Sequence, residues 1–302
     1  MIDRPKNDRP PEPPSANARD VGSAAPVERS ATGPSTPSPP IPACAMPARP
    51  LGSTRLRVPA LGFGAFKIGR NVGIRYEQPY ELPDEATAAA LLSGVLDLGM
   101  SLVDTAPAYG ISEERIGRHL GNRRREFVLC TKVGESFEGG RSRYDFSPEA
   151  IERSVRRSVA RLGGRLDILL VHADAEDQRR AEDRRIVDAL HRLREAGLVE
   201  LVGFSGRSAA AARSAMEWAD VLMVEYHRDA RDAEATLAEA HRRGIGTLVK
   251  KALASGRLPA EEAISFALAN DSVDCVVVGG ANLSHLRANA AAAIAARGAA
   301  PG

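Results

Sequence analysis

The amino-acid sequence predicts an α/β fold, a single closed (β/α)8 TIM barrel behind a proline-rich N-terminal tail. From residue 61 onward, eight short apolar segments alternate with stretches of helical spacing. Residues 50–302 amount to roughly 250 residues, the usual size of one such barrel. An open doubly wound sheet is the structural alternative, but the G-x-G-x-x-G turn that typically follows its first strand is missing. These observations favour the barrel.

Residues 1–49 are expected to form a disordered tail. Thirteen of the 20 prolines lie within residues 1–50, among Ser, Ala, Arg and Asp. Such a composition buries too little apolar surface to offset the entropy of ordering the chain. The tail mixes acidic with basic residues and has no apolar stretch, so it resembles neither a secretory signal nor a transit peptide. Met46 precedes the first regular segment, so the tail is either partly a mis-assigned start or an ordinary proline-rich extension.

The eight apolar or β-branched segments are expected to be strands. They are continuous apolar runs, which is typical of parallel strands covered on both faces. In chain order they are LGFGAFK at 61–67, SLVDTA at 101–106, EFVLCTK at 126–132, LDILLVH at 166–172, LVELVGFS at 198–205, DVLMVEY at 220–226, GIGTLVKK at 244–251 and VDCVVVGG at 273–280. Helical segments between them imply parallel crossovers, and eight units without a ninth imply closure.

The helical segments have recognisable ends. Ser147, followed by Pro and Glu, is a good helix start, because the hydroxyl caps the first turn and the acid suits the positive end of the helix dipole. Gly163 ends that helix. Asp84 and Gly99 bound an earlier helix in the same way, and Ser284 is expected to open the last one.

Composition excludes several classes of function. The net charge is +2, and the arginine runs at 123–125 and 179–180 lie beside acidic residues, which indicates a solvated surface rather than a nucleic-acid interface. The sequence has no uninterrupted stretch of about 18 apolar residues, so no membrane span is expected. Cys44, Cys130 and Cys275 lack metal or redox spacing, so we expect no metal, buried reduced thiols and a cytoplasmic location.

Four ionisable residues fall where the predicted strands end. Asp104 ends the second strand, Lys132 the third and His172 the fourth, while Tyr109 follows in the loop after Asp104. In barrels, chemistry occurs at the carboxyl ends of the strands. A phenol has a pKa of about 10; a neighbouring ammonium stabilises the phenolate and lowers that pKa, and a carboxylate anchors the ammonium. An imidazole is able to orient a carbonyl oxygen.

Each of these four residues also has an ordinary explanation. An Asp at a strand end is often only a helix cap, and a Tyr in a loop often only packs. Four such residues on adjacent strand ends are much less expected by coincidence. The set predicts Tyr109 as general acid, Lys132 as the group that tunes it, Asp104 as the anchor of Lys132 and His172 as the orienting group.

The sequence resembles the aldo-keto reductase superfamily over nearly all of residues 50–295. GMSLVDTAPAYGISEERIGRHL at 99–120 has the D-T-A-x-x-Y pattern of its second strand and loop. EFVLCTKV at 126–133 and DILLVHADA at 167–175 resemble the strands that carry its Lys and His. The resemblance implies those catalytic roles for Asp104, Tyr109, Lys132 and His172. It also implies metal-free hydride transfer between a nicotinamide cofactor and a small aldehyde or ketone.

The resemblance further implies a set of cofactor-binding positions. They are Ser205, Gly206, Met223, Lys250, Lys251, Gly279, Gly280, His285 and Asn289. The nicotinamide is expected near Ser205. Gly206 stands where many members have Asn, Met223 where a Gln is frequent at the end of the sixth strand, and Lys250 where an aromatic residue commonly stacks on the nicotinamide. Lys250 and Lys251 are interpreted either as contacts to cofactor phosphates or as a solvent-facing pair.

The choice between NADPH and NADH rests on the segment after the eighth strand. Members strict for NADPH often have a Lys and an Arg there, where this chain has Gly279 and His285, whereas Asn289 is retained. Backbone donors of Gly279, Gly280 and the last helix are able to bind a phosphate, and Arg287 is a candidate replacement cation. NADPH is expected, with NADH as the alternative.

Two other functions are weighed against the reductase. The altered positions Gly206, Met223 and Lys250 favour a cofactor-binding sensor barrel with little catalysis, whereas the four complete catalytic positions argue against it. A Schiff-base aldolase would use Lys132 or Lys250 as its nucleophile. Lys132 beside Asp104 is expected to be charged, which makes it a poor nucleophile.

Overall fold

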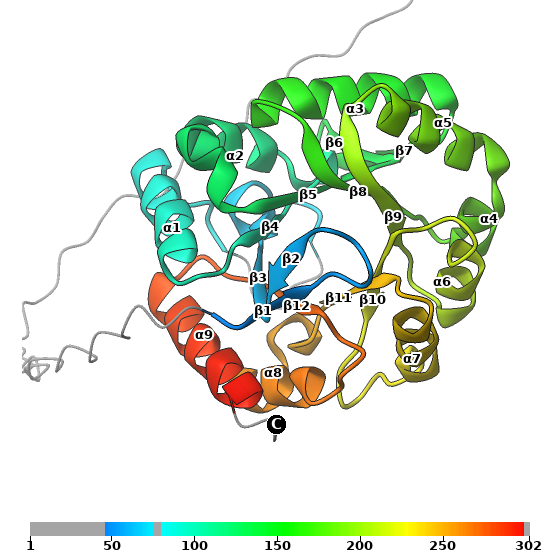
Figure 1. The fold of residues 1–302 in the computed structure, drawn as a ribbon. Coiled ribbons are helices and arrows are strands. Elements are labelled where there is room, and N and C mark those ends of the chain that lie inside the picture. The colour runs from blue at the N-terminus through cyan, green and yellow to red at the C-terminus, as the bar shows by residue number, and fades with distance from the viewer. Residues whose placement is uncertain (1–45, 75–79, 299–302) are drawn as a thin grey trace, which may run out of the picture. The chain divides into compact units, whose positions relative to one another are not determined.

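The computed structural model describes residues 46–74 and 80–298. Within them, eight parallel strands close into a barrel in the order in which they occur along the chain, and the helices surround it (Figure 1). This confirms the predicted (β/α)8 barrel, because an open sheet would leave two edge strands unpaired. The tail expected over residues 1–49 lies outside the described residues up to residue 45.

The barrel strands agree closely with the predicted segments. They are β3 (Leu61–Gly64), β4 (Leu102–Asp104), β5 (Val128–Val133), β8 (Leu166–His172), β9 (Val199–Ser205), β10 (Val221–Glu225), β11 (Gly246–Lys250) and β12 (Cys275–Gly279). The fourth predicted strand has the bounds of β8. The first is shorter than predicted, because the chain turns into the 3-10 helix η1 (Ala65–Ile68) directly after β3.

Nine α-helices are described, and each barrel strand is followed by at least one of them. They are α1 (Glu85–Asp97), α2 (Ser112–Leu120), α3 (Pro148–Leu162), α4 (Asp177–Glu182), α5 (Arg184–Glu195), α6 (Ala209–Ala215), α7 (Glu234–Arg242), α8 (Ala260–Leu268) and α9 (Leu283–Gly298). Short 3-10 helices occur at η2 (Pro107–Tyr109), η3 (Gly121–Glu126) and η4 (Ala254–Gly256). None of the helices in the described part of the chain is long and apolar enough to span a membrane.

The predicted helix ends are mostly confirmed. Ser147 caps α3 by accepting a 3.3 Å hydrogen bond from the Ala150 amide, and Gly163 ends it with φ +78°. Asp84 caps α1. The last helix differs: α9 begins at Leu283, and the Oδ1 atom of Asn282 accepts the Ser284 and His285 amides at 2.8 and 3.2 Å. Asn282 is therefore the cap, because its side chain accepts hydrogen bonds from both amides.

The apolar side chains form two layers of core. The outer layer lies between the strands and the helices, and the inner layer fills the barrel. Alternate residues of one strand enter opposite layers, which is why these strands read as continuous apolar runs. In β8, for example, Ile168 and Leu170 face inward while Leu169 and Val171 face the helices. Cys130 and Cys275 are buried free thiols of the inner layer, as expected, and Cys44 lies outside the described residues.

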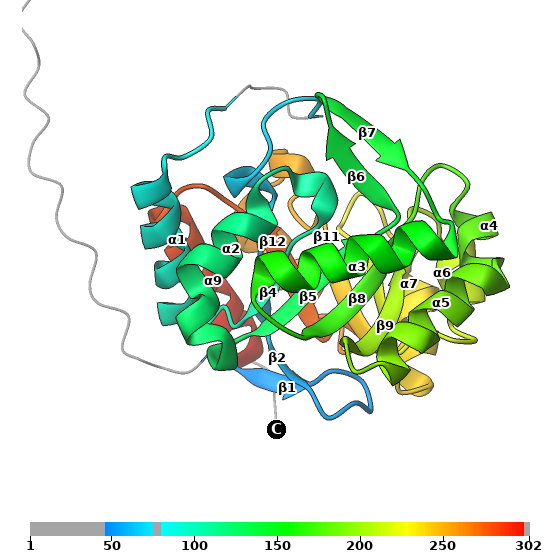
Figure 2. The same cartoon turned by 90° about the horizontal axis from the view of Figure 1, so that it is seen from above.

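Two antiparallel hairpins lie at opposite ends of the barrel (Figure 2). One joins β1 (Ala48–Pro50) to β2 (Arg57–Pro59), and Leu51 and Val58 beside them belong to the inner core. The other joins β6 (Glu135–Glu138) to β7 (Arg141–Tyr144) directly after β5. Met46 is buried against the outer core. Residues 46–49, which the sequence assigned to the tail, therefore belong to the barrel domain.

The loop that carries Tyr109 is held by close backbone packing. Gly110 has φ +61°, a region that favours glycine. A Cβ atom at Gly69 would lie only 2.1 Å from the Tyr109 carbonyl oxygen. The Gly69 carbonyl accepts a 3.2 Å hydrogen bond from the Ile111 amide. The two glycines thus let the loops after β3 and β4 touch, which fixes Tyr109 over the barrel mouth.

Candidate active site

The structure brings the four predicted catalytic side chains together at the carboxyl ends of neighbouring strands. Lys132 Nζ donates hydrogen bonds to Asp104 Oδ1 at 2.5 Å, to the Thr105 carbonyl oxygen at 2.9 Å and to the Tyr109 hydroxyl at 3.1 Å. The rings of Tyr109 and His172 lie edge to face with centroids 6.1 Å apart. Phenol, ammonium and carboxylate therefore form one continuous chain of hydrogen bonds.

Lys132 is a fully engaged ammonium group. Its side chain is only 1% exposed, and its three acceptors match the three N–H groups of an ammonium. Burial alone would lower the pKa of Lys132, but Asp104, Tyr109 and Cys130 together outweigh it and raise that pKa above its usual range. Such an amine has no free electron pair, so the site is built around a permanent positive charge.

Tyr109 differs in one respect from the prediction. The Lys132 ammonium does act to lower the pKa of Tyr109, but burial outweighs it and raises that pKa to about 12. The phenolate would have to leave water for a buried position beside Phe66, whose ring is 5.0 Å from that of Tyr109. Tyr109 is thus held as a protonated phenol beside a cation, an arrangement suited to donating a proton.

Sequence reasoning missed a carboxylate that pairs with His172. Glu135, the first residue of β6, lies with Oε2 3.0 Å from His172 Nδ1 and with Oε1 3.9 Å from Arg70 Nη1. Burial would raise the pKa of Glu135, but His172, Ser142 and Arg70 together hold it at about 2. Burial lowers the pKa of His172, against the pull of Glu135. The carboxylate therefore faces one ring nitrogen and leaves the other for the cavity.

Arg70 joins the loop that carries Tyr109 to the β6–β7 hairpin. Its guanidinium donates to the Ala108 carbonyl at 3.0 Å and to the Ser142 hydroxyl at 3.3 Å, and it stacks 3.8 Å from the centroid of the Phe137 ring. Tyr144 of β7 lines the cavity, whereas Phe137 packs on Arg70.

A cavity of about 1290 Å³ covers this end of the barrel. The predicted site residues that line it are Asp104, Tyr109, His172, Gly206, Lys250, Lys251, Gly279, Gly280, His285 and Asn289. Lys132 and Ser205 are buried directly beneath it, each hydrogen-bonded to a residue of its lining. The cavity is therefore shared by the catalytic and the cofactor positions.

Met223 does not reach the cavity. It is the middle residue of β10, 1% exposed, and packs in the inner core. Glu225 ends the strand, lines the cavity and accepts a hydrogen bond from Lys251 Nζ at 2.5 Å. Because side chains of a strand alternate, Met223 and Glu225 share a face, and only the residue nearer the strand's end reaches the mouth. The residue at the end of this strand that lines the cavity is therefore Glu225, and the prediction of Met223 for this position is wrong.

Lys250 and Lys251 have different surroundings. Lys250 Nζ donates to the Ser205 hydroxyl at 2.9 Å and to the Gly206 carbonyl at 2.7 Å, while Lys251 pairs with Glu225. Burial, helped by Lys132 and Lys251, lowers the pKa of Lys250 to about 7. Lys251 begins a bent loop in which Ala254 and Ser255 also have positive φ, a strained conformation typical of functional loops. The pair is therefore not simply solvent-facing.

The segment after β12 is less cationic than a strict NADPH site would require. His285 and Asn289 line the cavity there, but Arg287 does not. The amides of Ser284 and His285 are already satisfied by Asn282, so a phosphate at this helix end would compete with the cap. Arg257, in the loop after β11, is one of the arginines that line the cavity.

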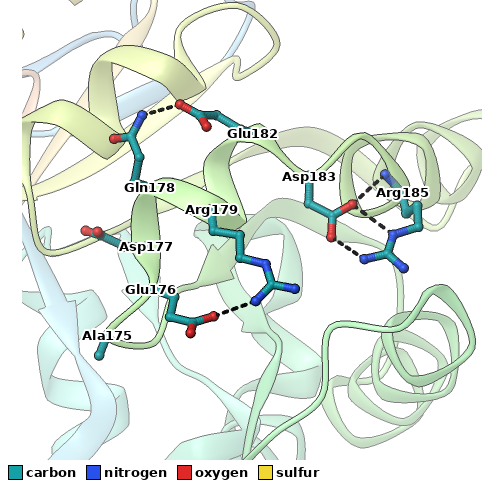
Figure 3. A pocket seen from close by; sticks show the side chains of 8 residues that line it. All are labelled: Ala175, Glu176, Asp177, Gln178, Arg179, Glu182, Asp183 and Arg185. Carbon is teal, nitrogen blue, oxygen red and sulfur yellow. Dashed lines mark hydrogen bonds and ion pairs between the residues drawn. The ribbon is translucent and has the colours of Figure 1, made fainter.

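A smaller hollow of about 550 Å³ at α4 has no comparable chemistry (Figure 3). Its charged side chains pair with each other: Arg179 with Glu176 at 3.1 Å, and Arg185 with Asp183 at 2.8 Å. The arginine of each pair is exposed, and exposed pairs contribute little energy. The hollow is a feature of the charged surface.

Comparison with known proteins agrees with this site. The model of the aldo/keto reductase family matches residues 60–263. A putative aldo-keto reductase from Pseudomonas aeruginosa is 39% identical, with a TM-score of 0.76 over 83% of this chain and 96% of that one. The holo form of an aldo-keto reductase from Bacillus halodurans is 25% identical, with a TM-score of 0.71 over 85% and 92%.

Curated relatives match over shorter stretches. L-galactose dehydrogenase from Arabidopsis thaliana is 34% identical over 168 residues, which are 52% of this chain and 48% of that protein. D-arabinose 1-dehydrogenase from Saccharomyces cerevisiae is 30% identical over 136 residues, or 43% and 39%. The chain thus spans about half the length, or less, of the curated relatives it matches.

The fold and the site together define a barrel with an oxidoreductase-type site at the carboxyl ends of its strands. Eight parallel strands present a buried carboxylate, an ammonium, a phenol and an imidazole to one cavity. With a family model that matches more than half of its length, the chain belongs to the aldo/keto reductase family.

Proposed function

We propose that the protein transfers hydride between a nicotinamide cofactor and a small carbonyl compound, with Tyr109 as the general acid. The observation that carries this proposal is the buried chain Asp104–Lys132–Tyr109, in which every N–H of the ammonium is engaged. A proton donor fixed in this way suits a carbonyl oxygen that gains negative charge as hydride arrives. The family membership supports the same reaction class.

The size and extent of the cavity support a dinucleotide as its ligand. The cavity runs from Tyr109 and His172 to His285 and Asn289 on α9. We propose that Ser205, Gly206 and Lys250 hold the nicotinamide end, with Glu225 in place of Met223. Arg257, Lys251, His285, Asn289 and the backbone of Gly279 and Gly280 would hold the phosphates and ribose. When bound, the cofactor supplies or accepts the hydride.

The residues of the chain then divide the remaining work. Tyr109 gives its proton to the oxygen, or takes it back in the oxidative direction. Lys132 stabilises the phenolate that remains, and Asp104 holds Lys132 in its charged form. His172, oriented by Glu135, binds the carbonyl oxygen from the side. Phe66 limits the access of water to Tyr109.

A polar substrate suits the outer wall of the cavity. Arg70, Glu135, Ser142, Tyr144 and Arg207 all line it there, and they offer donors and acceptors rather than an apolar slot. Two relatives are named as dehydrogenases of galactose and arabinose. We therefore propose hydroxylated aldehydes or sugars as the substrate class.

NADPH is the proposed cofactor, with NADH as the alternative. The cavity lining contributed by β12 and α9 contains neither Lys nor Arg, so recognition of a 2′-phosphate would rely on Arg257 or His285. Measuring kcat/KM for both cofactors with wild-type protein and Arg257→Ala tests this. A loss confined to NADPH supports the assignment, and an equal loss for both would show that Arg257 binds the shared pyrophosphate.

The sensor remains the second candidate, because Gly206 and Lys250 depart from the family's usual nicotinamide contacts. Consumption of NADPH and NADH with a panel of aldehydes separates the two functions. Turnover that depends on Tyr109 supports the reductase. Tight cofactor binding without turnover would support the sensor.

Glu135→Gln is expected to lower kcat/KM by about tenfold, a fraction of what an acid–base group contributes. The carboxylate favours the protonated imidazole of His172. Removing its charge therefore lowers the pKa of His172, and the limb of the pH–rate profile that reports His172 moves to lower pH. Steady-state rates across pH, together with an NMR titration of His172, measure the effect.

Glu138→Gln is the matched control for that variant. Glu138 lies on the same hairpin but is exposed, 3.9 Å from Arg157. Its replacement should leave both the rate and the profile unchanged. An unshifted profile in Glu135→Gln would show that Glu135 does not position His172.

A further inference from the structure

The lysines of this chain are few, and those in its described part lie at one place. Only five of its 41 basic residues are lysines, and the rest are arginines. Of the four lysines in the described part of the chain, Lys67, Lys250 and Lys251 line the cavity and Lys132 lies beneath it. Arginine serves for surface charge elsewhere. Lysine, unlike arginine, is able to lose its proton when buried, so its confinement to the cavity points to chemistry of the amine.

Lys250 is bonded as a neutral amine would be. Its Nζ has two acceptors, the Ser205 hydroxyl and the Gly206 carbonyl, which match the two N–H groups of an amine. Lys132, by contrast, has three acceptors, one of them a carboxylate. Three acceptors keep Lys132 protonated, whereas a third hydrogen on Lys250 Nζ would have no acceptor among the described residues.

The charges around Lys250 favour the same state. Within residues 46–74 and 80–298, Lys250 forms no ion pair, because the nearby Glu225 is engaged by Lys251. Burial, helped by the positive charges of Lys132 and Lys251, outweighs the opposing effect of Glu225 and Asp104 and brings the pKa of Lys250 to about 7. A substantial fraction of the side chain is therefore unprotonated near neutral pH.

We propose that Lys250 is a nucleophile that captures aldehydes reversibly as an imine within the cavity. The Nζ lone pair attacks the carbonyl carbon and forms the C–N bond. The two amine hydrogens leave with the carbonyl oxygen as one water molecule, and a C=N bond remains. No oxidant or reductant takes part. Lys250 lines the cavity that also holds Tyr109 and His172, so an aldehyde that enters for reduction meets this amine.

Capture would compete with the cofactor. The imine would occupy the floor beside Ser205 and Gly206, where we place the nicotinamide. This consequence rests on the proposed function, whereas the capture itself does not. At high aldehyde concentration, the free protein would be held as the imine, and reduction would show inhibition by aldehyde that NADPH relieves.

Cyanoborohydride trapping tests the capture in the full-length protein. Propanal is the probe, because it is small and uncharged, so the charged residues of the cavity do not attract it. The protein is incubated with propanal at pH 6 and pH 8, reduced with sodium cyanoborohydride and mapped by peptide mass spectrometry. We expect Lys250 to be the principal adduct at both pH values, with a several-fold higher yield at pH 8 than at pH 6. The few lysines make the other sites an internal reference.

Variants and cofactor complete the test. Lys250→Arg and Lys250→Met should both lose the adduct, while Lys251→Arg keeps it. NADPH added before propanal should protect Lys250 and leave Lys67 unprotected. Labelling of Lys250 no greater than that of Lys67 and Lys251, or labelling equal at both pH values, would overturn the proposal. Neither result depends on turnover, so capture without NADPH oxidation would reject only the proposed function, and oxidation without capture would reject only this inference.

Discussion

Tyr109→Phe is expected to lower kcat by about 10²- to 10⁴-fold, the range that a positioned acid–base group contributes. The variant keeps the ring that packs against Phe66 and loses only the hydroxyl that Lys132 contacts at 3.1 Å. Cofactor affinity should therefore stay nearly unchanged. Steady-state kinetics with an aldehyde panel, together with fluorescence titration of NADPH, measures both quantities.

Tyr226→Phe is the matched control for this variant. Tyr226 is also buried, but it packs against Phe266 in the outer core, away from the lining of the cavity. Its loss of a hydroxyl should leave kcat nearly unchanged, because Tyr226 does not line the cavity. Wild-type turnover in Tyr109→Phe would exclude Tyr109 as the proton donor.

Lys132→Met is expected to have the largest combined effect on activity and stability. Loss of the ammonium raises the pKa of Tyr109 further, so the loss of kcat should approach that of Tyr109→Phe. Asp104 would also be left buried without its partner. Breaking a buried pair by removing one partner costs about 3–5 kcal/mol of unfolding free energy. Urea denaturation followed by circular dichroism measures that cost.

The double variant Asp104→Asn with Lys132→Met separates stability from catalysis. It removes both charges, so the free energy of unfolding should recover by more than half of the single-variant loss. Activity should not recover, because the phenol still lacks its cation. Recovery of kcat together with stability would mean that Lys132 acts only by holding the fold.

The barrel and its four catalytic positions were accessible from the sequence for physical reasons. Strands buried on both faces must be apolar throughout, so an ionisable residue at the end of such a strand stands out. Asp104 and His172 end β4 and β8, and Lys132 is the last but one residue of β5. Parallel strands bring these ends to one edge, which is why sequence position predicted spatial proximity.

The remaining parts of the site were missed where a local pattern was misread. ESFE-GG-RSRY at 135–144 has the Gly-Gly turn between short strands that marks a hairpin, and with it the placement of Glu135 near His172 was available. Counting alternate residues from Val221 would have led past Met223 to Glu225. Both errors concern register and turns, which fix where a side chain points.

The protonation of the site was beyond sequence reasoning. Lys132 was expected to lower the pKa of Tyr109, yet burial prevails and raises it. Lys250 and Lys251 are neighbours in sequence, but only Lys251 forms an ion pair with a carboxylate, whereas Lys250 bonds to Ser205. Such outcomes depend on the sum of burial and charge from distant segments, and adjacent residues of one type therefore come to differ.

Transfer of deuterium from cofactor to product tests the central claim most directly. NADPH carrying deuterium on the transferred side of C4 is incubated with the protein and a hydroxylated aldehyde, and the alcohol is analysed by mass spectrometry; the same is done with NADH. The account predicts one deuterium on the carbinol carbon with wild-type protein, and almost none in the same time with Tyr109→Phe. Bound cofactor that keeps its deuterium in the presence of every aldehyde tried would contradict it and identify the barrel as a cofactor-binding sensor.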